Sequence, residues 1–332
     1  MNILILGAAS FIGKNLTLKL IENKENHVTL VDKKKIFFEE ISNLNLPNMS
    51  IIEHPLDQDS YLDNLLQGQD IVYHLVSSDV YPTSNQHITK DIEENVLFSS
   101  RLFDSCVRNN IKKVIFVSSG GAVYGKVANC PISEDTLTQP ITSYGVQKVM
   151  IEQLLYVYHY AHGLDYRIIR LANPYGPYQR PNGVQGAVTS FTYKALKNEE
   201  IVVYGDGSVI RDYIYIDDAI KAIVTISDND SRFRIFNLGS GKGTSVNEIL
   251  KIIEDTLEVQ LRVVYKEGRA ADVPVNYLDM SRYNETFGQI KPTDLGEGIR
   301  KTVAFFENVK SYDAVLDDVA DKVYTRDIFR RD

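Results

Sequence analysis

Strand-like and helix-like segments alternate through the first half of this chain, and that order limits the folds it can adopt. Short apolar runs typical of buried strands lie at residues 2–6, 28–31, 50–53, 70–76, 113–118 and 166–171. Helical patterns separate them at 14–23, 58–67, 86–110 and 143–162. Alternation of this kind predicts an α/β fold, with a doubly wound parallel sheet covered by helices on both faces. Ligands of such sheets bind at the carboxyl ends of the strands.

A glycine turn follows the first strand, in the segment 7–13, Gly-Ala-Ala-Ser-Phe-Ile-Gly. Glycines let the backbone approach a pyrophosphate, which the N-terminus of the next helix then stabilises. The spacing fits a Rossmann-type pattern, G-x-x-G-x-x-G, with a serine in the middle place. The cofactor-binding candidates in this turn are Gly7, Ser10, Phe11, Ile12 and Gly13.

The second strand ends in Asp32, about 20 residues after the last glycine of the turn. A carboxylate at that place suits the ribose 2′-hydroxyl of a dinucleotide and repels a 2′-phosphate, so the sequence predicts NAD rather than NADP. Lys33, Lys34 and Lys35 follow directly. They either weaken that preference or form a solvated turn.

Tyr144 and Lys148 are the candidate catalytic pair. Four residues apart on a helix, they share one face, and a lysine charge near a phenol lowers its pKa from about 10. The tyrosine then becomes a usable general base near neutral pH. A second Tyr-x-x-x-Lys pair, Tyr193 and Lys197, is expected to be an ordinary helix face, because only the first pair follows a strand that ends in serines, at 118–119.

The composition of the sequence changes after residue 172, because the segment 173–183 is rich in turn-forming residues. We expect a Rossmann-type domain over 1–172, to which about 212–240 returns. A smaller, interleaved substrate domain is expected over 173–211 and 241–307. The remaining residues, 308–332, form a charged tail of no predicted role.

The bulk composition fits a globular enzyme of 332 residues with a formal net charge of −8, which argues against general nucleic-acid binding. The two cysteines, Cys106 and Cys130, indicate a reducing compartment. We see no secretory signal, and the apolar run 2–6 is too short to span a membrane. We therefore expect a cytoplasmic protein with no membrane partner. Six scattered histidines predict no metal site.

Several ordered motifs resemble those of the extended short-chain dehydrogenase/reductase family, particularly its nucleotide-sugar 4-epimerases. The resemblance covers residues 1 to about 307. Besides the glycine turn, the shared motifs are Ser118-Ser119-Gly120-Gly121-Ala122-Val123-Tyr124-Gly125, Ser143-Tyr144-x-x-x-Lys148, Arg170-Leu171-Ala172-Asn173-Pro174-Tyr175-Gly176-Pro177, Tyr204-Gly205-Asp206-Gly207-Ser208, Arg211-Asp212-Tyr213 and Arg269-x-x-Asp272-x-Pro274.

The resemblance implies a role for each matching residue. Tyr144 is the proton carrier, and Lys148 is its electrostatic partner and a ribose ligand. Further cofactor ligands implied are Asp57, Leu75, Val76, Ser77, Asn95 and Ser118. Substrate ligands implied are Asn173, Tyr204, Arg211, Arg269, Asp272 and Asn276. The arginines suit a diphosphate because the planar guanidinium pairs with phosphate oxygens.

One departure from the family pattern lies beside the catalytic tyrosine. The active-site Ser or Thr of the family precedes Val-Tyr-Gly by three residues, and that place is Gly120 here. Either Ser119 or Ser118 shifts into the catalytic role, with Ser119 preferred, or the site works without that hydroxyl. Gly121 and Ala122 also argue against a 4,6-dehydratase, which places acidic residues there.

The function that the resemblance implies is an NAD-dependent 4-epimerase of a UDP-hexose, a homodimer that holds its cofactor tightly. Asn276 stands where a bulky tyrosine restricts relatives to plain hexoses, so we expect N-acetylated UDP-hexoses to be accepted too. UDP-glucuronate 4-epimerisation is an alternative. So is a nucleotide-sugar reductase or dehydrogenase with net redox, although Asp32 disfavours NADPH. A nucleotide-binding structural protein with a failed site is a third, which the intact Tyr144 and Lys148 oppose.

Overall fold

The structure is a computed structural model. It describes residues 1–33, 38, 41, 46–56, 59–77, 85, 88–181, 186–268 and 273–308. Its largest element is a seven-stranded sheet in the order β10-β6-β5-β4-β1-β2-β3, and every pair of neighbours in it is parallel. The predicted fold class, a doubly wound parallel α/β sheet, is therefore confirmed.

The strands of this sheet are short, and all except β3 are mostly buried. They are β1 (Asn2–Leu6), β2 (His27–Asp32), β3 (Met49–Glu53), β4 (Ile71–His74), β5 (Lys113–Ser119), β6 (Tyr166–Leu171) and β10 (Ile235–Leu238). The strand order reverses between β1 and β4, and the crevice at such a switch point is where doubly wound sheets bind ligands.

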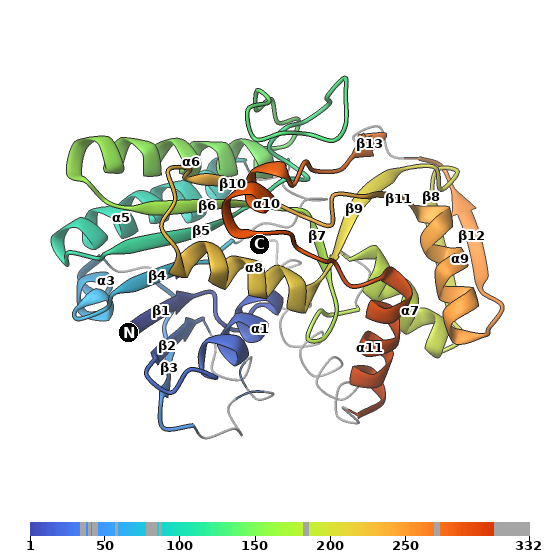
Figure 1. Cartoon of the computed structure of the whole chain (residues 1–332), viewed down its shortest axis with the longest axis horizontal. Coiled ribbons are helices and arrows are strands. Elements are labelled where there is room, and N and C mark those ends of the chain that lie inside the picture. Colours follow the sequence, from blue (N-terminus) through green and yellow to red (C-terminus); the bar gives the residue numbers. More distant parts are fainter. Residues whose placement is uncertain are drawn as a thin grey trace, which may run out of the picture.

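Helices cover both faces of the sheet, so the strands lie between two apolar layers. One face carries α1 (Phe11–Leu20) and α8 (Ile216–Asp228), which share the first core cluster. The other face carries α3 (Asp59–Leu66), α5 (Phe98–Arg108) and α6 (Ser143–His162). Figure 1 shows this three-layered part on the left. A short helix, α4 (Ile88–Ile92), and a π-helix, η2 (Glu93–Leu97), lead into α5.

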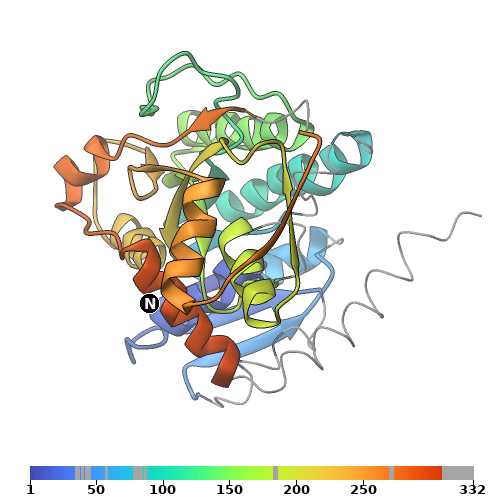
Figure 2. The same cartoon turned by 90° about the vertical axis from the view of Figure 1, so that its right-hand side faces the viewer.

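A second, smaller part is built from later residues and lies on the right of Figure 1. Its strands are β7 (Asn173–Tyr175), β8 (Glu200–Tyr204), β9 (Ile210–Tyr215), β11 (Gly243–Ser245), β12 (Arg262–Lys266) and β13 (Val275–Asn276). Its helices are α7 (Ala187–Leu196), α9 (Val246–Leu257) and α11 (Leu295–Asn308), and α10 (Ser281–Phe287) follows β13 and packs beside β10. β9 pairs with β7, β11 and β13, while β8 pairs with β12. Figure 2 turns this smaller part toward the viewer.

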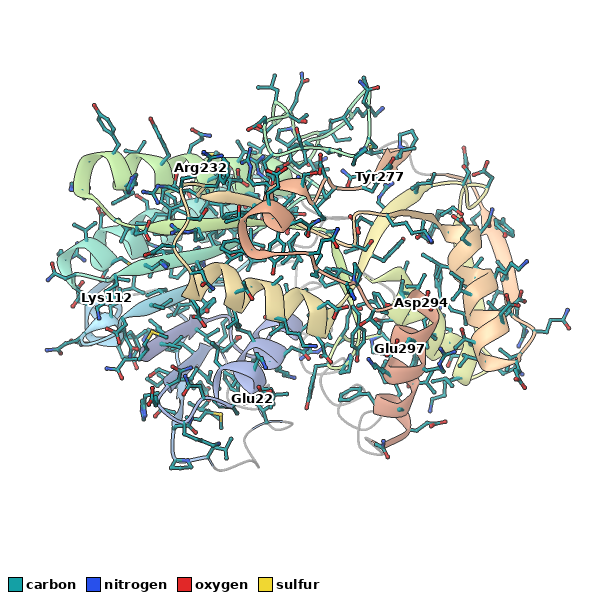
Figure 3. The ribbon with its side chains drawn as sticks, in the orientation of Figure 1. Glu22, Lys112, Arg232, Tyr277, Asp294 and Glu297 are labelled. Carbon is teal, nitrogen blue, oxygen red and sulfur yellow. The ribbon has the colours of Figure 1, made fainter. Side chains whose placement is uncertain are left out.

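Asp212 on β9 ties the two parts together. Its buried carboxylate accepts hydrogen bonds from the backbone and hydroxyl of Ser240, from the backbone of Gly241 and from the backbone of Leu278. Two separate segments, 240–241 and the one around Leu278, thus donate to one side chain, and these hydrogen bonds stabilise the buried acid. Tyr277, labelled in Figure 3, lies in the segment that this contact holds in place.

Within the part of the chain that the structure describes, no helix has the length and apolar character needed to cross a membrane.

Candidate active site

The glycine turn is shaped by backbone contacts that exclude side chains. Gly7 has a positive φ of 80°, and a Cβ on Gly13 would lie 2.5 Å from the carbonyl oxygen of Ala8. The helix that follows begins at Phe11, three residues earlier than predicted, because Ser10 caps it: its Oγ accepts the Gly13 N–H at 3.1 Å. The serine in the middle place of the motif therefore builds the N-terminus that a pyrophosphate needs.

Asp32 ends β2 directly beside this turn. Its carboxylate accepts the backbone N–H of Ala9 at 3.0 Å and that of Lys33 at 2.8 Å. Burial raises the pKa of Asp32 above its ordinary value, against the lowering effect of these hydrogen bonds. The cradle of glycines with a carboxylate at its edge fits the pyrophosphate and adenosine ribose of NAD. Lys34, Lys35 and Asp57 lie outside the described residues.

The end of β4 packs against the same turn. Leu75 donates its N–H to Leu6 at 3.0 Å, and its backbone lies 3.0 Å from the position of a Cβ on Gly7. Val76 is partly buried and Ser77 exposed, and both stay candidates for contact with the cofactor.

Tyr144 and Lys148 lie in the first turns of α6, whose N-cap Thr142 accepts the Gly145 N–H. The Lys148 ammonium is 5.5 Å from the centre of the Tyr144 ring and donates to the Val117 carbonyl at 3.3 Å. The lysine is only 5% exposed, while the tyrosine is partly exposed. A poorly hydrated cation beside a phenol favours the phenolate, which is what a proton carrier needs.

The two serines at the end of β5 have different surroundings. Ser118 is buried, and its hydroxyl donates to Glu152 on α6 at 2.5 Å. Glu152 also forms a buried pair with Arg170 at 2.7 Å. The Ser118 hydroxyl therefore serves a structural network, and sequence reasoning missed the acid that engages it. Ser119 is partly exposed at the strand end, so its side chain is not buried as that of Ser118 is.

Gly120 is fixed by packing. A Cβ at this position would lie 2.6 Å from Cδ1 of Leu278 and 3.0 Å from the carbonyl oxygen of Arg170. The Gly120 carbonyl in turn accepts the side-chain amide of Asn276 at 3.3 Å. Asn276 is 1% exposed, so its amide already has a protein partner. The place of the family's hydroxyl is thus occupied by the Leu278 side chain.

Asn95 lies in the π-helix η2, next to α6. Its side-chain amide donates to the Asp91 carbonyl at 3.0 Å and to the Gln147 side chain at 2.8 Å. π-helical turns are rare and recur at functional sites. Gln147 was not among the predicted site residues, although it directly precedes Lys148.

The substrate-side candidates gather around β9. Asn173 on β7 donates to the Asp212 carbonyl at 2.8 Å, and Arg211 donates to the Val273 carbonyl at 2.5 Å. Arg211 stands in register with Asn276 on β13. Tyr204 is 44% exposed at the end of β8, farther along the second part. Arg269 and Asp272 lie outside the described residues.

Comparison with known proteins agrees with this geometry. A model of the NAD-dependent epimerase/dehydratase family matches residues 3–239. A putative UDP-glucose 4-epimerase of Methanocaldococcus jannaschii is 32% identical over 308 residues, which cover 92% of this chain and 98% of that relative.

Two solved structures are also similar over nearly the whole chain. A Thermotoga maritima UDP-glucose 4-epimerase with UDP-glucose has 33% identity and a TM-score of 0.86, covering 93% of this chain and 99% of that one. A Methanobrevibacter ruminantium UDP-N-acetylglucosamine 4-epimerase in complex with UDP-N-acetylmuramic acid has 34% identity and a TM-score of 0.84, covering 92% and 98%. The chain belongs to the NAD-dependent epimerase/dehydratase family.

Proposed function

We propose that this chain is an NAD-dependent epimerase that inverts C4 of a UDP-hexose through a transient 4-keto sugar. The observation that carries the proposal is the position of Tyr144 and Lys148. Both lie on one face of α6, next to the end of β5. The glycine turn and Asp32 follow the ends of β1 and β2, at the same carboxyl edge of the parallel sheet. Relatives with the same overall structure are named as 4-epimerases.

The chain's own residues would move the proton and hold the reactants. Tyr144 takes the proton of the sugar 4-hydroxyl and later returns it to the ketone oxygen. Lys148 stabilises the phenolate during this exchange. Ser119 donates a hydrogen bond to the 4-oxygen, while Arg211 and Asn173 bind the diphosphate. The glycine turn and Asp32 would hold NAD, which would supply reversible hydride transfer at C4 of the sugar.

Epimerisation is favoured over net redox by the cofactor end of the site. The Asp32 carboxylate lies beside the glycine turn, where its negative charge would repel the 2′-phosphate that NADPH carries. A reductase would also need to exchange its cofactor in every turnover. An epimerase regenerates NAD in place and retains it.

The proposed substrates are UDP-glucose and UDP-galactose together with their N-acetyl forms. The two similar structures are nearly equal in identity to this chain, and their names cover both a plain and an N-acetylated hexose. Asn276 is smaller than a tyrosine and its side-chain amide donates to the Gly120 carbonyl, so we infer that it leaves room for an N-acetyl group at C2 of the sugar. The deciding measurement is the ratio of kcat/KM values for acetylated and plain sugars, and a large preference for plain hexoses contradicts the wide pocket.

The function is tested by incubating the purified protein, without added cofactor, with a panel of UDP-sugars that includes UDP-glucuronate. We expect C4 epimers to form and NAD to be released only on denaturation. Product that requires added NADPH, or a 4-keto or reduced sugar as the final product, contradicts the epimerase assignment and favours the net-redox alternative.

We also propose a cytoplasmic homodimer. We infer the compartment from the two cysteines, Cys106 and Cys130, which are free thiols. Exposed apolar side chains form one stripe along α6, at Val146, Met150 and Val157. Such a stripe suits a second copy of the helix. Light scattering should give twice the chain mass, and Met150→Glu should give a monomer; a monomeric parent protein contradicts this assembly.

A further inference from the structure

A line of buried polar side chains connects the π-helix with the first turn of the catalytic helix. Gln147 accepts a hydrogen bond from the Asn95 amide at 2.8 Å and donates one to the Ser143 hydroxyl at 3.0 Å. All three side chains are at least nine-tenths buried. Hydrogen bonds among buried groups fix geometry firmly, because leaving any one of them unmade costs about 1–3 kcal/mol.

The line continues from Asn95 to the sheet. The Ser99 hydroxyl donates to the Asn95 carbonyl at 2.6 Å, and it lies 2.8 Å from Nε2 of His74. Because its single proton is given to Asn95, Ser99 accepts from His74, whose Nε2 therefore carries the hydrogen. His74 ends β4 and pairs in register with Leu6, just before the glycine turn. The cofactor edge of the sheet is thus linked to α6.

The positions of Ser143 and Gln147 on α6 explain how these hydrogen bonds can orient the catalytic pair. Ser143 directly precedes Tyr144, and Gln147 directly precedes Lys148. Ser143 and Gln147 lie four residues apart and share a helix face, turned about 100° from the face of the catalytic pair. Fixing one face of the first turn therefore fixes the direction in which the other face points.

We propose that Gln147 is a positioning residue for proton transfer: it clamps the first turn of α6 to the π-helix and thereby fixes Tyr144 against Lys148. The inference rests on the proposed role of that pair. A primary amide suits the position because it accepts from Asn95 and donates to Ser143 at once. Displacements of about 1 Å are enough to slow an enzyme about 100-fold, so a clamp of this kind has a measurable effect.

The test is Gln147→Met, which keeps the length of the side chain and removes the hydrogen bonds to Asn95 and Ser143. We expect kcat to fall about tenfold, or about 1.4 kcal/mol, with NAD affinity changed less than about twofold. The acidic limb of the kcat profile should move up by about half a pH unit, since a less well placed lysine favours the phenolate less. A wild-type kcat and pH profile in this variant overturns the proposal.

Two further variants separate positioning from general destabilisation. Ser143→Ala acts on the same line, so Ser143→Ala/Gln147→Met should be no slower than about twice the slower single variant; full additivity contradicts the clamp. Asn48→Leu removes a buried amide that bonds Ile21 and Asn26 far from the site. It should lower Tm and leave kcat unchanged, and an equal loss of kcat there makes the Gln147 effect merely structural.

A readout without substrate keeps this inference distinct from the epimerase assignment. Tyr144 ionisation is followed by tyrosinate absorption in the NAD complex, as the difference from a Tyr144→Phe protein. Gln147→Met should shift that midpoint upward even if no UDP-sugar is epimerised, in which case only the proposed function fails. An unchanged midpoint overturns the clamp whether or not the protein is an epimerase.

Discussion

The chain contains two Tyr-x-x-x-Lys pairs that have the same distance between ammonium and ring but different surroundings. In both, the ammonium lies 5.5 Å from the tyrosine ring centre: Lys148 over Tyr144 and Lys197 over Tyr193. Lys148 is buried in the second turn of α6, whereas Lys197 is an exposed residue at the end of α7. The four-residue spacing brings each lysine close to its tyrosine ring. The burial of the lysine then determines whether its charge can lower the pKa of the tyrosine enough for proton transfer.

The physical difference is solvation. Water screens the Lys197 charge, so it perturbs its tyrosine little, while the Lys148 charge acts through a low-dielectric surrounding. The Tyr193 ring also packs edge-on against Phe306, with ring centres 5.2 Å apart, in the manner of a structural aromatic. The comparison predicts that paired substitutions at the two sites give very different losses.

The largest expected effect is at the two tyrosines. Tyr144→Phe should lower kcat by about 1,000-fold, within the range for loss of a general acid–base, and leave NAD bound. Tyr193→Phe should leave kcat within about twofold. Steady-state epimerase rates of both purified proteins provide the measurement. Near-normal turnover in Tyr144→Phe would contradict the assignment of Tyr144 as the proton carrier and make Tyr193 the next candidate.

The lysines come next. Lys148→Ala should lower kcat about 100-fold, because the phenolate loses a poorly screened charge, and should also weaken NAD binding, since the same ammonium is the proposed ribose ligand. Lys197→Ala should change neither quantity. Calorimetric titration of cofactor-free protein gives the NAD affinity beside the rates. If both alanine variants lose activity equally, burial does not distinguish the pairs.

The neighbouring serines sharpen the contrast within the first site. Ser119→Ala should lower kcat about 30-fold, the scale of one hydrogen bond to a developing charge. Ser118→Ala should instead lower the free energy of unfolding by about 1–2 kcal/mol, because Glu152 loses a buried donor, and should barely change kcat. Epimerisation rates and urea unfolding of the two variants distinguish the catalytic serine from the structural one. Equal, small rate effects mean that the reaction proceeds without a serine hydroxyl.

The sheet was predictable from the sequence because its signal is local. Buried parallel strands are continuous apolar runs between turn signals, and the runs at 2–6 and 166–171 appear unchanged as β1 and β6. The helix predicted over 86–110 is interrupted by the π-turn η2. A single extra residue in a turn hardly alters apolar periodicity, so no pattern in the sequence marks it.

Within the site, the sequence indicated residue types but not which of them meet. Tyr144, Lys148 and Asp32 follow from spacing and strand ends. The contact of Gly120 with Leu278 joins residues far apart in the chain, and so does the pairing of Ser118 and Glu152. Such contacts depend on how β13 and α6 pack, which short-range patterns do not encode. That is why the departure at Gly120 was visible beforehand and its cause was not.

The smallest expected effect is on the pH dependence of stability, and it comes from His74, which lies near the buried Lys148. Lys148 sits 4.8 Å over the Phe116 ring, and His74 packs against that same ring with centres 5.2 Å apart. Burial, with the Lys148 charge as the second cause, lowers the pKa of His74 to about 3. His74 is therefore neutral in the folded protein at every pH where the enzyme is expected to work.

This neutrality makes stability depend on pH in a definite direction. In the unfolded chain His74 titrates near its ordinary pKa of about 6.5, so between pH of about 6.5 and about 3 the unfolded state binds the extra proton and gains stability relative to the fold. Its contribution is complete above that window and falls by about 1.4 kcal/mol at pH 5.5.

His74→Gln keeps a donor for Ser99 and does not titrate. Urea unfolding at pH 7 and pH 5.5 should show the parent protein losing about 1.2 kcal/mol more than this variant, because both share all other titrating groups. Parallel losses would mean that His74 is protonated beside Lys148, and that the surroundings of the first pair are far more polar than its burial indicates.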